Sequence, residues 1–171
     1  VGPRLVGKAG DRLWIDGRLQ GGELMFFALS DGKTVQPMQA ALDYKQAFAS
    51  DEAVAIRLFN KNAGNPNLDN SPNTGGMGAY SPLPFITKAD EEFALQKIML
   101  PTAKAMIAEG CPFKGVLYGG LMKTPNGIKV VEFNARFGDP ETEVVLPRLT
   151  ADIVDIFTAI IDGTTPVLTW D

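Results

Sequence analysis

The segment that most constrains this chain is residues 130–141, which read VVEFNARFGDPE. It begins as a strand, and side chains alternate between the two faces of a strand. Glu132, Asn134 and Arg136 therefore share one face, which is polar. The residues between them are apolar, and we expect this second face to pack on a core: Val131, Phe133 and Ala135.

The polar face carries groups suited to a metal ion and a phosphate. A carboxylate beside an amide oxygen is a hard-oxygen ligand set that suits magnesium, which points to Glu132 and Asn134. Arg136, one step further, suits a phosphate held by two parallel hydrogen bonds. In the turn that follows, Asp139 is predicted to cap a helix and Pro140 to occupy its first turn. The alternative is a solvated strand face without a function.

A second block, residues 72–82, reads PNTGGMGAYSP and has no hydrophobic period. Glycines let backbone N–H groups approach an anion or a small ligand closely. Alone, the segment would be interpreted as a flexible loop.

Together, the glycine-rich block and EFNARFGDPET resemble one family, the phosphoribosylamine–glycine ligases, also called glycinamide ribonucleotide synthetases. These are ATP-grasp enzymes of purine synthesis. The resemblance covers most of the chain, although the first eight residues match nothing. Shorter stretches also match the family pattern, each of them weakly: residues 9–12 (AGDR), 13–15 (LWI), 31–35 (DGKTV), 115–122 (GVLYGGLM) and 145–149 (VLPRL).

The resemblance implies an α+β fold: an ATP-grasp core with an antiparallel sheet and flanking helices. It also implies ATP-dependent joining of glycine to 5-phosphoribosylamine through a glycyl phosphate, with Mg²⁺ or Mn²⁺ as the metal. Carried onto this sequence, the metal ligands are Glu132 and Asn134, and the catalytic residues are Arg136 and Asp139. The nucleotide-binding residues are Asp16, Glu23 and Arg136. The substrate-binding residues are Asp43, Lys45, Asn73, Thr74, Gly75, Gly76, Met77, Gly78 and Glu141.

The chain departs from the family pattern in three short motifs, and its loop between residues 43–46 and Pro72 is longer than usual for the family. Residues 16–17 are Asp-Gly, where the family usually has two acids in the hinge that grips adenine and ribose. Residues 21–23 are Gly-Gly-Glu rather than Gly-Glu-Glu, and residues 43–46 are Asp-Tyr-Lys-Gln rather than Asp-His-Lys-Arg. Two alternatives therefore stay open: another ATP-grasp ligase, and a non-catalytic binding or scaffold module.

Composition narrows the function classes. The 171 residues are 45% hydrophobic, which suits one globular domain with a sizeable core. A net charge of -4 gives no case for nucleic acid binding, and no apolar run is long enough for a membrane span. The absence of histidine excludes histidine-based catalysis, and the single cysteine, Cys111, suits a reducing cytoplasm. No leader peptide is visible.

Hydrophobic patterns predict the elements. Strands are expected at residues 13–15, 24–29, 34–38 and 53–59, with 24–29 central because it is apolar on both faces. Residues 40–71 show no clear period, and residues 60–73 should form a flexible, exposed loop. A helix over 88–109 should break near Pro101. A hairpin joins 116–122 to 128–133, and a helix capped by Thr150 should run to Asp162, with Gly163 ending it.

The resemblance also predicts how the chain relates to a whole enzyme. Residues 1–171 correspond to the ATP-grasp catalytic core. The family's N-terminal domain, most of its small ATP lobe and its C-terminal domain have no counterpart here. We therefore expect this chain alone to be inactive, and to self-associate through exposed apolar surface.

Overall fold

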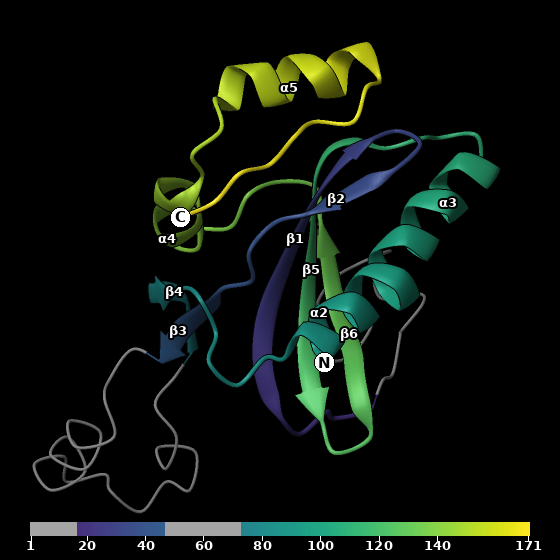
Figure 1. Cartoon of the computed structure of the whole chain (residues 1–171). Coiled ribbons are helices and arrows are strands. Elements are labelled where there is room, and N and C mark those ends of the chain that lie inside the picture. Colours follow the sequence, from purple (N-terminus) through teal and green to yellow (C-terminus); the bar gives the residue numbers. More distant parts are fainter. Residues whose placement is uncertain (1–16, 47–72) are drawn as a thin grey trace, which may run out of the picture.

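The computed structural model describes residues 17–46 and 73–171 (Figure 1). Predictions for residues 1–16 and 47–72, which include two strands and most of the expected loop, lie outside these ranges. The described chain forms a four-stranded antiparallel sheet, a separate two-stranded pair and helices on both sides of the larger sheet, which confirms the α+β class. None of the helices in these ranges is both long and apolar enough to cross a membrane.

Strand β1 (Gly22–Asp31) lies inside the larger sheet, whose order is β2-β1-β5-β6. It pairs with β2 (Val35–Pro37) on one side and with β5 (Lys114–Thr124) on the other. Phe26 enters one hydrophobic cluster and Phe27 enters the cluster on the opposite face. The prediction of a central strand is confirmed, because β1 is buried on both faces.

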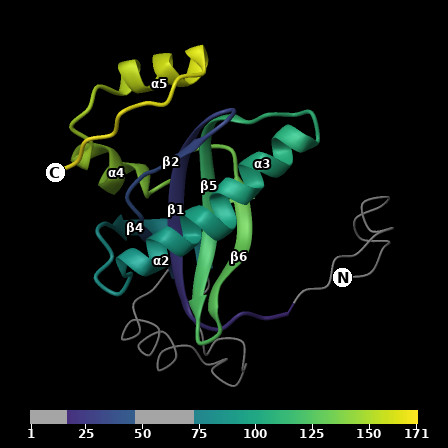
Figure 2. The same cartoon turned by 45° about the vertical axis from the view of Figure 1, so that its right-hand side comes forward.

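One face of the sheet is covered by a continuous helical segment (Figure 2). It consists of α2 (Lys88–Ala94), a π-helical turn η4 (Leu95–Met99) and α3 (Leu100–Ala108). Pro101 lies in the first turn of α3, directly after η4. Proline has no N–H to donate, and the helix changes register directly before it. The disruption predicted at Pro101 takes the form of this change of register, and the helical segment is not interrupted.

The other face packs against α4 (Thr142–Val145), the short 3₁₀ turn η5 (Leu146–Arg148) and α5 (Ile153–Asp162). The prediction that Thr150 caps α5 was wrong. The N-cap is Asp152, whose carboxylate accepts a hydrogen bond from the Val154 N–H at 2.7 Å. Thr150 pairs instead with Thr169, hydroxyl to hydroxyl at 2.7 Å.

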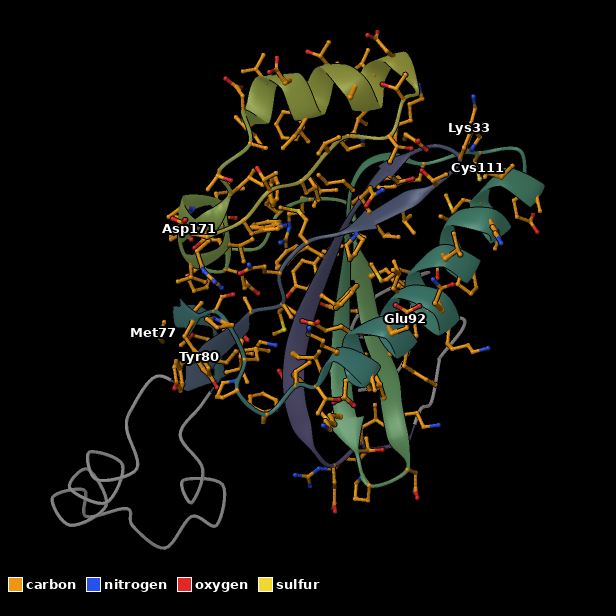
Figure 3. The ribbon with its side chains drawn as sticks, in the orientation of Figure 1. Lys33, Met77, Tyr80, Glu92, Cys111 and Asp171 are labelled. Carbon is orange, nitrogen blue, oxygen red and sulfur yellow. The ribbon has the colours of Figure 1, made fainter. Side chains whose placement is uncertain are left out.

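The glycine-rich block is a strand and not a loop. β4 (Asn73–Tyr80) pairs antiparallel with β3 (Leu42–Gln46) in a two-stranded sheet. A bridge between Met25 and Ala41 ties the start of this pair to β1. Met77 of β4 is 61% exposed and lies at the outer side of the pair (Figure 3). A strand with so many glycines has no side-chain period, so the sequence pattern did not reveal it.

The apolar face of residues 131–135 does not pack on a core among the described residues, contrary to prediction. β6 (Gly127–Asn134) is the last strand of the sheet, hydrogen-bonded to β5. Gly120 pairs with Glu132 and Leu121 with Val130, so Val131 is an extra residue in a β-bulge. Val131 is 55% exposed and Phe133 is 40% exposed. Ala135, just past the strand, is exposed as well.

Candidate functional site

The end of β6 and the glycine-rich strand β4 meet at one cavity of about 400 Å³. Its lining residues come from these two segments, which are far apart in the sequence: Gly75, Gly76, Arg136, Phe137 and Asp139. The approach is close because Gly76 has no side chain. A Cβ there would lie 2.4 Å from Pro140 Cδ and 3.0 Å from the Asp139 carbonyl oxygen.

Glu132 and Asn134 lie on the same side of β6. The Asn134 amide donates a hydrogen bond to Glu132 Oε1 at 3.0 Å. Gly120 on β5 makes room beside them, since a Cβ there would lie 3.2 Å from Glu132 Cγ. Within residues 17–46 and 73–171 no group of three or more acidic, histidine or cysteine side chains surrounds a metal position. A carboxylate and an amide oxygen nevertheless fit Mg²⁺, which takes few protein ligands when phosphates and waters complete its shell.

The turn after β6 differs from the predicted helix cap. α4 begins after Glu141, its N-cap residue, so Asp139 does not cap it. The Gly138 carbonyl instead accepts hydrogen bonds from the backbone N–H and the hydroxyl of Thr142, which fixes the turn. Asp139 remains exposed at the wall of the cavity, where its carboxylate can meet a ligand.

Glu141 is 2% exposed and lies beneath this turn. Its Oε1 accepts a hydrogen bond of 2.8 Å from the Tyr118 hydroxyl of β5, whereas Oε2 is buried without a hydrogen-bond partner among the described residues. Gly138 leaves the space that this carboxylate fills, because a Cβ at Gly138 would lie 2.2 Å from Glu141 Oε2. Burial, the hydrogen bond to Glu141 and nearby negative charges raise the pKa of Tyr118, so its hydroxyl keeps the proton that it donates.

A second buried carboxylate, Asp43, belongs to β3. Its Oδ1 is also buried without a hydrogen-bond partner among the described residues, and its Oδ2 lies 3.9 Å from the Lys45 ammonium. Burial raises the pKa of Asp43, the charge of Lys45 lowers it, and the charge of Glu141 raises it, with a net rise. Lys45 also bonds Glu23 Oε2 at 2.9 Å. Burial lowers the pKa of Lys45, but the Glu23 hydrogen bond and the neighbouring carboxylates raise it overall. Lys45 therefore stays charged between the two acids.

The remaining predicted site residues either belong to β4 or lie outside the described residues. Thr74 lies at the start of β4, where its hydroxyl donates to the Lys45 carbonyl at 2.9 Å and accepts from the Gly76 N–H at 3.2 Å. Asn73 pairs with Gln46 across the two strands. Met77 and Gly78 belong to β4 but do not line the cavity. Asp16 lies outside the described residues.

The structure adds one residue that the sequence did not single out. Tyr118 contacts Glu141 through its hydroxyl, and the Arg136 guanidinium carbon lies 5.9 Å from the centre of its ring. A tyrosine within an apolar strand carries no motif. The only signal was its place in GVLYGGLM, a stretch that also matches the family pattern.

Comparison with known proteins identifies the family. Residues 2–142 match the model of the phosphoribosylglycinamide synthetase ATP-grasp (A) domain. The chain belongs to this family. The predicted resemblance and the ATP-grasp fold are thereby confirmed.

Individual relatives agree with this family. A phosphoribosylamine–glycine ligase of Halalkalibacterium halodurans is 46% identical over 165 residues, which are 96% of this chain and 34% of that protein. A phosphoribosylamine–glycine ligase of Listeria monocytogenes is 46% identical over 160 residues, 94% of this chain and 34% of that protein. The crystal structure of phosphoribosylamine–glycine ligase from Thermotoga maritima superposes with a TM-score of 0.69 at 27% identity, covering 88% of this chain and 33% of that one. The ATP-grasp chain therefore spans about a third of the length of these relatives.

A larger hollow of about 500 Å³ lies elsewhere, between α2 and the end of the chain. Two cationic side chains line it, Lys88 and Arg148, and Arg148 is already bonded to the Gln39 side chain and to the Asp171 carbonyl. Two residues of its wall are part of the packing on the α2–α3 face: Phe26 belongs to the core there, and Leu95 packs against it. The cavity at the end of β6 is smaller, but it is where the family's polar motif and glycine strand converge.

Proposed function

We propose that the complete protein carrying this chain joins glycine to 5-phosphoribosylamine at the expense of ATP, giving glycinamide ribonucleotide, ADP and phosphate. The observation that carries the proposal is the cavity where Gly75 and Gly76 face Arg136 and Asp139, in the segment that directly follows the Glu132–Asn134 pair, in a chain of this family.

The chemistry needs no nucleophile from the protein. The glycine carboxylate attacks the γ-phosphorus of ATP, which releases ADP and forms glycyl phosphate. The amine of phosphoribosylamine then attacks the glycyl carbonyl, loses a proton and expels phosphate. The protein contributes by positioning the reactants and stabilising their charges.

Arg136 is suited to hold a phosphate or phosphoryl group. It is exposed at the cavity, its guanidinium donates to the Phe137 carbonyl at 2.9 Å, and the planar fork has further N–H groups to offer an anion. Asp139, on the same wall, can accept a hydrogen bond from an amine. The backbone of Gly75 and Gly76 can approach the ligand closely from the opposite side.

Glu132 and Asn134 would hold Mg²⁺ or Mn²⁺, which when bound neutralises charge on the phosphates of ATP. Glu23 belongs to the proposed nucleotide side of the site and Lys45 to the substrate side. Their ion pair supports placing the two sides next to each other. Asp43 and Glu141 would support the substrate side from within. The nucleotide role of Asp16 stays a proposal from the sequence.

We further propose that the protein works in the cytoplasm on small molecules, without a nucleic acid or membrane partner. The net charge of -4 supports this, since nucleic acid binding favours a basic surface.

The test is ADP release by the complete protein, measured with and without glycine and phosphoribosylamine. We expect release to require both substrates. Glu132→Gln should lower kcat/KM by about 100-fold or more, the effect of removing one electrostatic stabiliser from a preorganised site. Far-UV circular dichroism should stay unchanged, because Glu132 is exposed.

Glu143→Gln is the matched control, because Glu143 is an exposed acid of α4 that does not line the cavity. It should retain wild-type turnover. Equal losses in the two variants would contradict the metal-ligand role of Glu132. Nucleotide binding without any turnover would instead indicate the alternative, a non-catalytic binding module.

A further inference from the structure

Tyr118 contacts two charged side chains of the proposed site, Arg136 and Glu141. It is 6% exposed on β5, in the layer beneath the cavity. Its register partner across the β5–β6 ladder is Asn134, so it sits directly beside the end of the motif strand. The family-like stretch GVLYGGLM contains this residue but does not single it out. Its contacts reach both the exposed Arg136 and the buried Glu141.

The first contact is with Arg136. The guanidinium carbon lies 5.9 Å from the centre of the Tyr118 ring, within the range of a cation–π interaction. Arg136 is exposed and has a long, flexible side chain, so without a support its direction would vary. The Phe137 carbonyl accepts one of its hydrogen bonds, and the Tyr118 ring supplies a second point of support.

The second contact is with Glu141. The Tyr118 hydroxyl donates to Oε1 at 2.8 Å, and this bond is buried. Since Glu141 Oε2 has no hydrogen-bond partner among the described residues, the tyrosine supplies the side-chain hydrogen bond that holds this carboxylate. The carboxylate in turn fills the space that Gly138 leaves under the turn carrying Asp139.

The ring itself is held in place. Its centroid lies 4.9 Å from that of Phe27 of the central strand β1, with the planes tilted by 45°. The ring centroid of Phe27 also lies 6.4 Å from that of Phe137, the residue after Arg136. The tyrosine is therefore part of a packed aromatic cluster that connects the core to the end of β6.

We propose that Tyr118 is a positioning residue, whose ring sets the direction of the Arg136 guanidinium toward the phosphate of a sugar phosphate and whose hydroxyl holds Glu141 beneath the turn. This inference rests on the proposed function for the identity of the substrate. It does not depend on that function for its main measurement, which is the binding of a sugar phosphate.

The test compares Tyr118→Phe, Tyr118→Leu and Arg136→Met in the complete protein, with ribose 5-phosphate as the probe in isothermal titration calorimetry. Tyr118→Leu removes the ring and should raise the Kd about 10-fold, within the range of a cation–π contact. Tyr118→Phe keeps the ring and should bind within about threefold of wild type, but its melting temperature should fall because buried Glu141 loses the hydrogen bond from the hydroxyl. Tyr118→Leu added to Arg136→Met should have no further effect on the Kd, because the ring acts through the arginine.

Phe113→Leu is the matched control. Phe113 packs on the cluster at the opposite, α2–α3 face of the sheet, so the change also removes a partly buried ring. It should lower the melting temperature without changing the Kd for ribose 5-phosphate. A Kd change equal to that of Tyr118→Leu would mean that any loss of packing weakens the site, and would overturn the positioning role.

The remaining outcomes separate the two proposals. If Tyr118→Leu is folded and binds as wild type does, or if the wild type does not bind ribose 5-phosphate, the positioning role is wrong. If binding depends on Tyr118 but the wild type shows no glycine-dependent ADP release, the positioning role stands and the proposed reaction is wrong. In an active enzyme the KM for phosphoribosylamine should rise with the Kd, whereas the KM for glycine should not.

Discussion

At the scale of single residues, the site depends on where side chains are missing as much as on where they are present. Gly76 lets β4 approach the turn at Pro140, Gly120 makes room for Glu132, and Gly138 makes room for the Glu141 carboxylate. A Cβ at Gly76 or Gly138 would overlap its neighbour, and a Cβ at Gly120 would crowd the Glu132 side chain. The glycines therefore set the geometry in which charged groups can converge.

Replacing Gly76 tests this geometry. In Gly76→Ala the new Cβ would lie 2.4 Å from Pro140 Cδ, so β4 or the turn must move. We expect a loss of about 1–3 kcal/mol in the free energy of unfolding, the usual cost of overpacking. Urea denaturation measures it.

The matched control is Gly78→Ala in the same strand, where a Cβ would meet nothing within 4 Å. Its free energy of unfolding should change by no more than about 0.5 kcal/mol, as at other open surface positions. If both alanine variants unfold at the same urea concentration, the close approach at Gly76 does not contribute to stability.

Strand alternation correctly grouped Glu132 with Asn134, since the hydrogen bond between them requires a shared face. The same rule wrongly predicted that Val131 packs on a core. It assumes that the strand pairs without interruption and that other residues cover its apolar face. The bulge at Val131 and the edge position of β6 are tertiary features that one strand's sequence does not encode. Asp139 was mistaken for a cap for a similar reason. Its turn is fixed by bonds between Thr142 and the Gly138 carbonyl, and these do not follow from residue preferences.

At the scale of elements, prediction succeeded where a pattern was long and failed where it was short. The central strand β1 follows from a run of apolar residues, and the change of helix register before Pro101 follows from the missing N–H of proline. β3 and β4 were missed, because five residues in one strand and a glycine-rich sequence in the other show no period. Their pairing is set by long-range contact between them, which a local pattern cannot report.

Helix α2 offers a test of how an element is fixed to the sheet. Thr87 and Asp90 form a reciprocal capping box at its start. Lys123 of β5 donates to Asp90 Oδ2 at 2.7 Å and links this cap to the sheet. The Lys123 and Thr87 hydrogen bonds lower the pKa of Asp90 to about 2.

Because the folded-state pKa of Asp90 is depressed, its contribution to stability is fully present above the unfolded-state pKa, near the usual 3.8. That contribution is lost as the pH falls through about 2. Lys123→Met removes the largest cause of the shift and should lower the free energy of unfolding at neutral pH by about 1 kcal/mol, the upper range for a partly exposed pair.

The difference between wild type and Lys123→Met should shrink as the pH falls from 3.8 toward 2, because Asp90 becomes protonated in both proteins. Thermal unfolding across this range measures it. Lys104→Met, at an exposed lysine of α3, is the control and should show no such convergence. A constant difference between wild type and Lys123→Met at every pH would assign the loss to packing and not to the ion pair.

At the scale of the whole molecule, one sheet supports two hydrophobic clusters. The α2–α3 segment covers one face, and the segments around α4 and α5 cover the other (Figures 1 and 2). The sequence indicated the fold through its resemblance to ATP-grasp ligases. Hydrophobic patterns typical of strands in some segments and of helices in others indicated the same fold. The contact between β4 and the end of β6 could be anticipated only from the resemblance, because their separation in the chain exceeds any local pattern.

The sheet is not closed at β6 within residues 17–46 and 73–171, where β6 is hydrogen-bonded to β5 alone. Three of its side chains are large, apolar and at least 39% exposed: Val130, Val131 and Phe133. An exposed, apolar edge strand is a template for pairing with another chain. We therefore predict that the isolated 171-residue chain self-associates, with β6 of one copy beside β6 of another.

Val131→Lys tests this arrangement, because a lysine on an edge strand opposes pairing by charge and by its need for water. Sedimentation velocity over a range of concentrations should show a rising sedimentation coefficient for the wild type and a constant, monomeric one for Val131→Lys. Val167→Lys is the matched control: Val167 is 77% exposed and lies after α5, away from the sheet edge. If both lysine variants stay monomeric, added charge and not the β6 edge accounts for the effect. If both lysine variants still self-associate, the copies meet through another surface. A contact between two β6 strands would bring the two new lysines together, and their repulsion would weaken it.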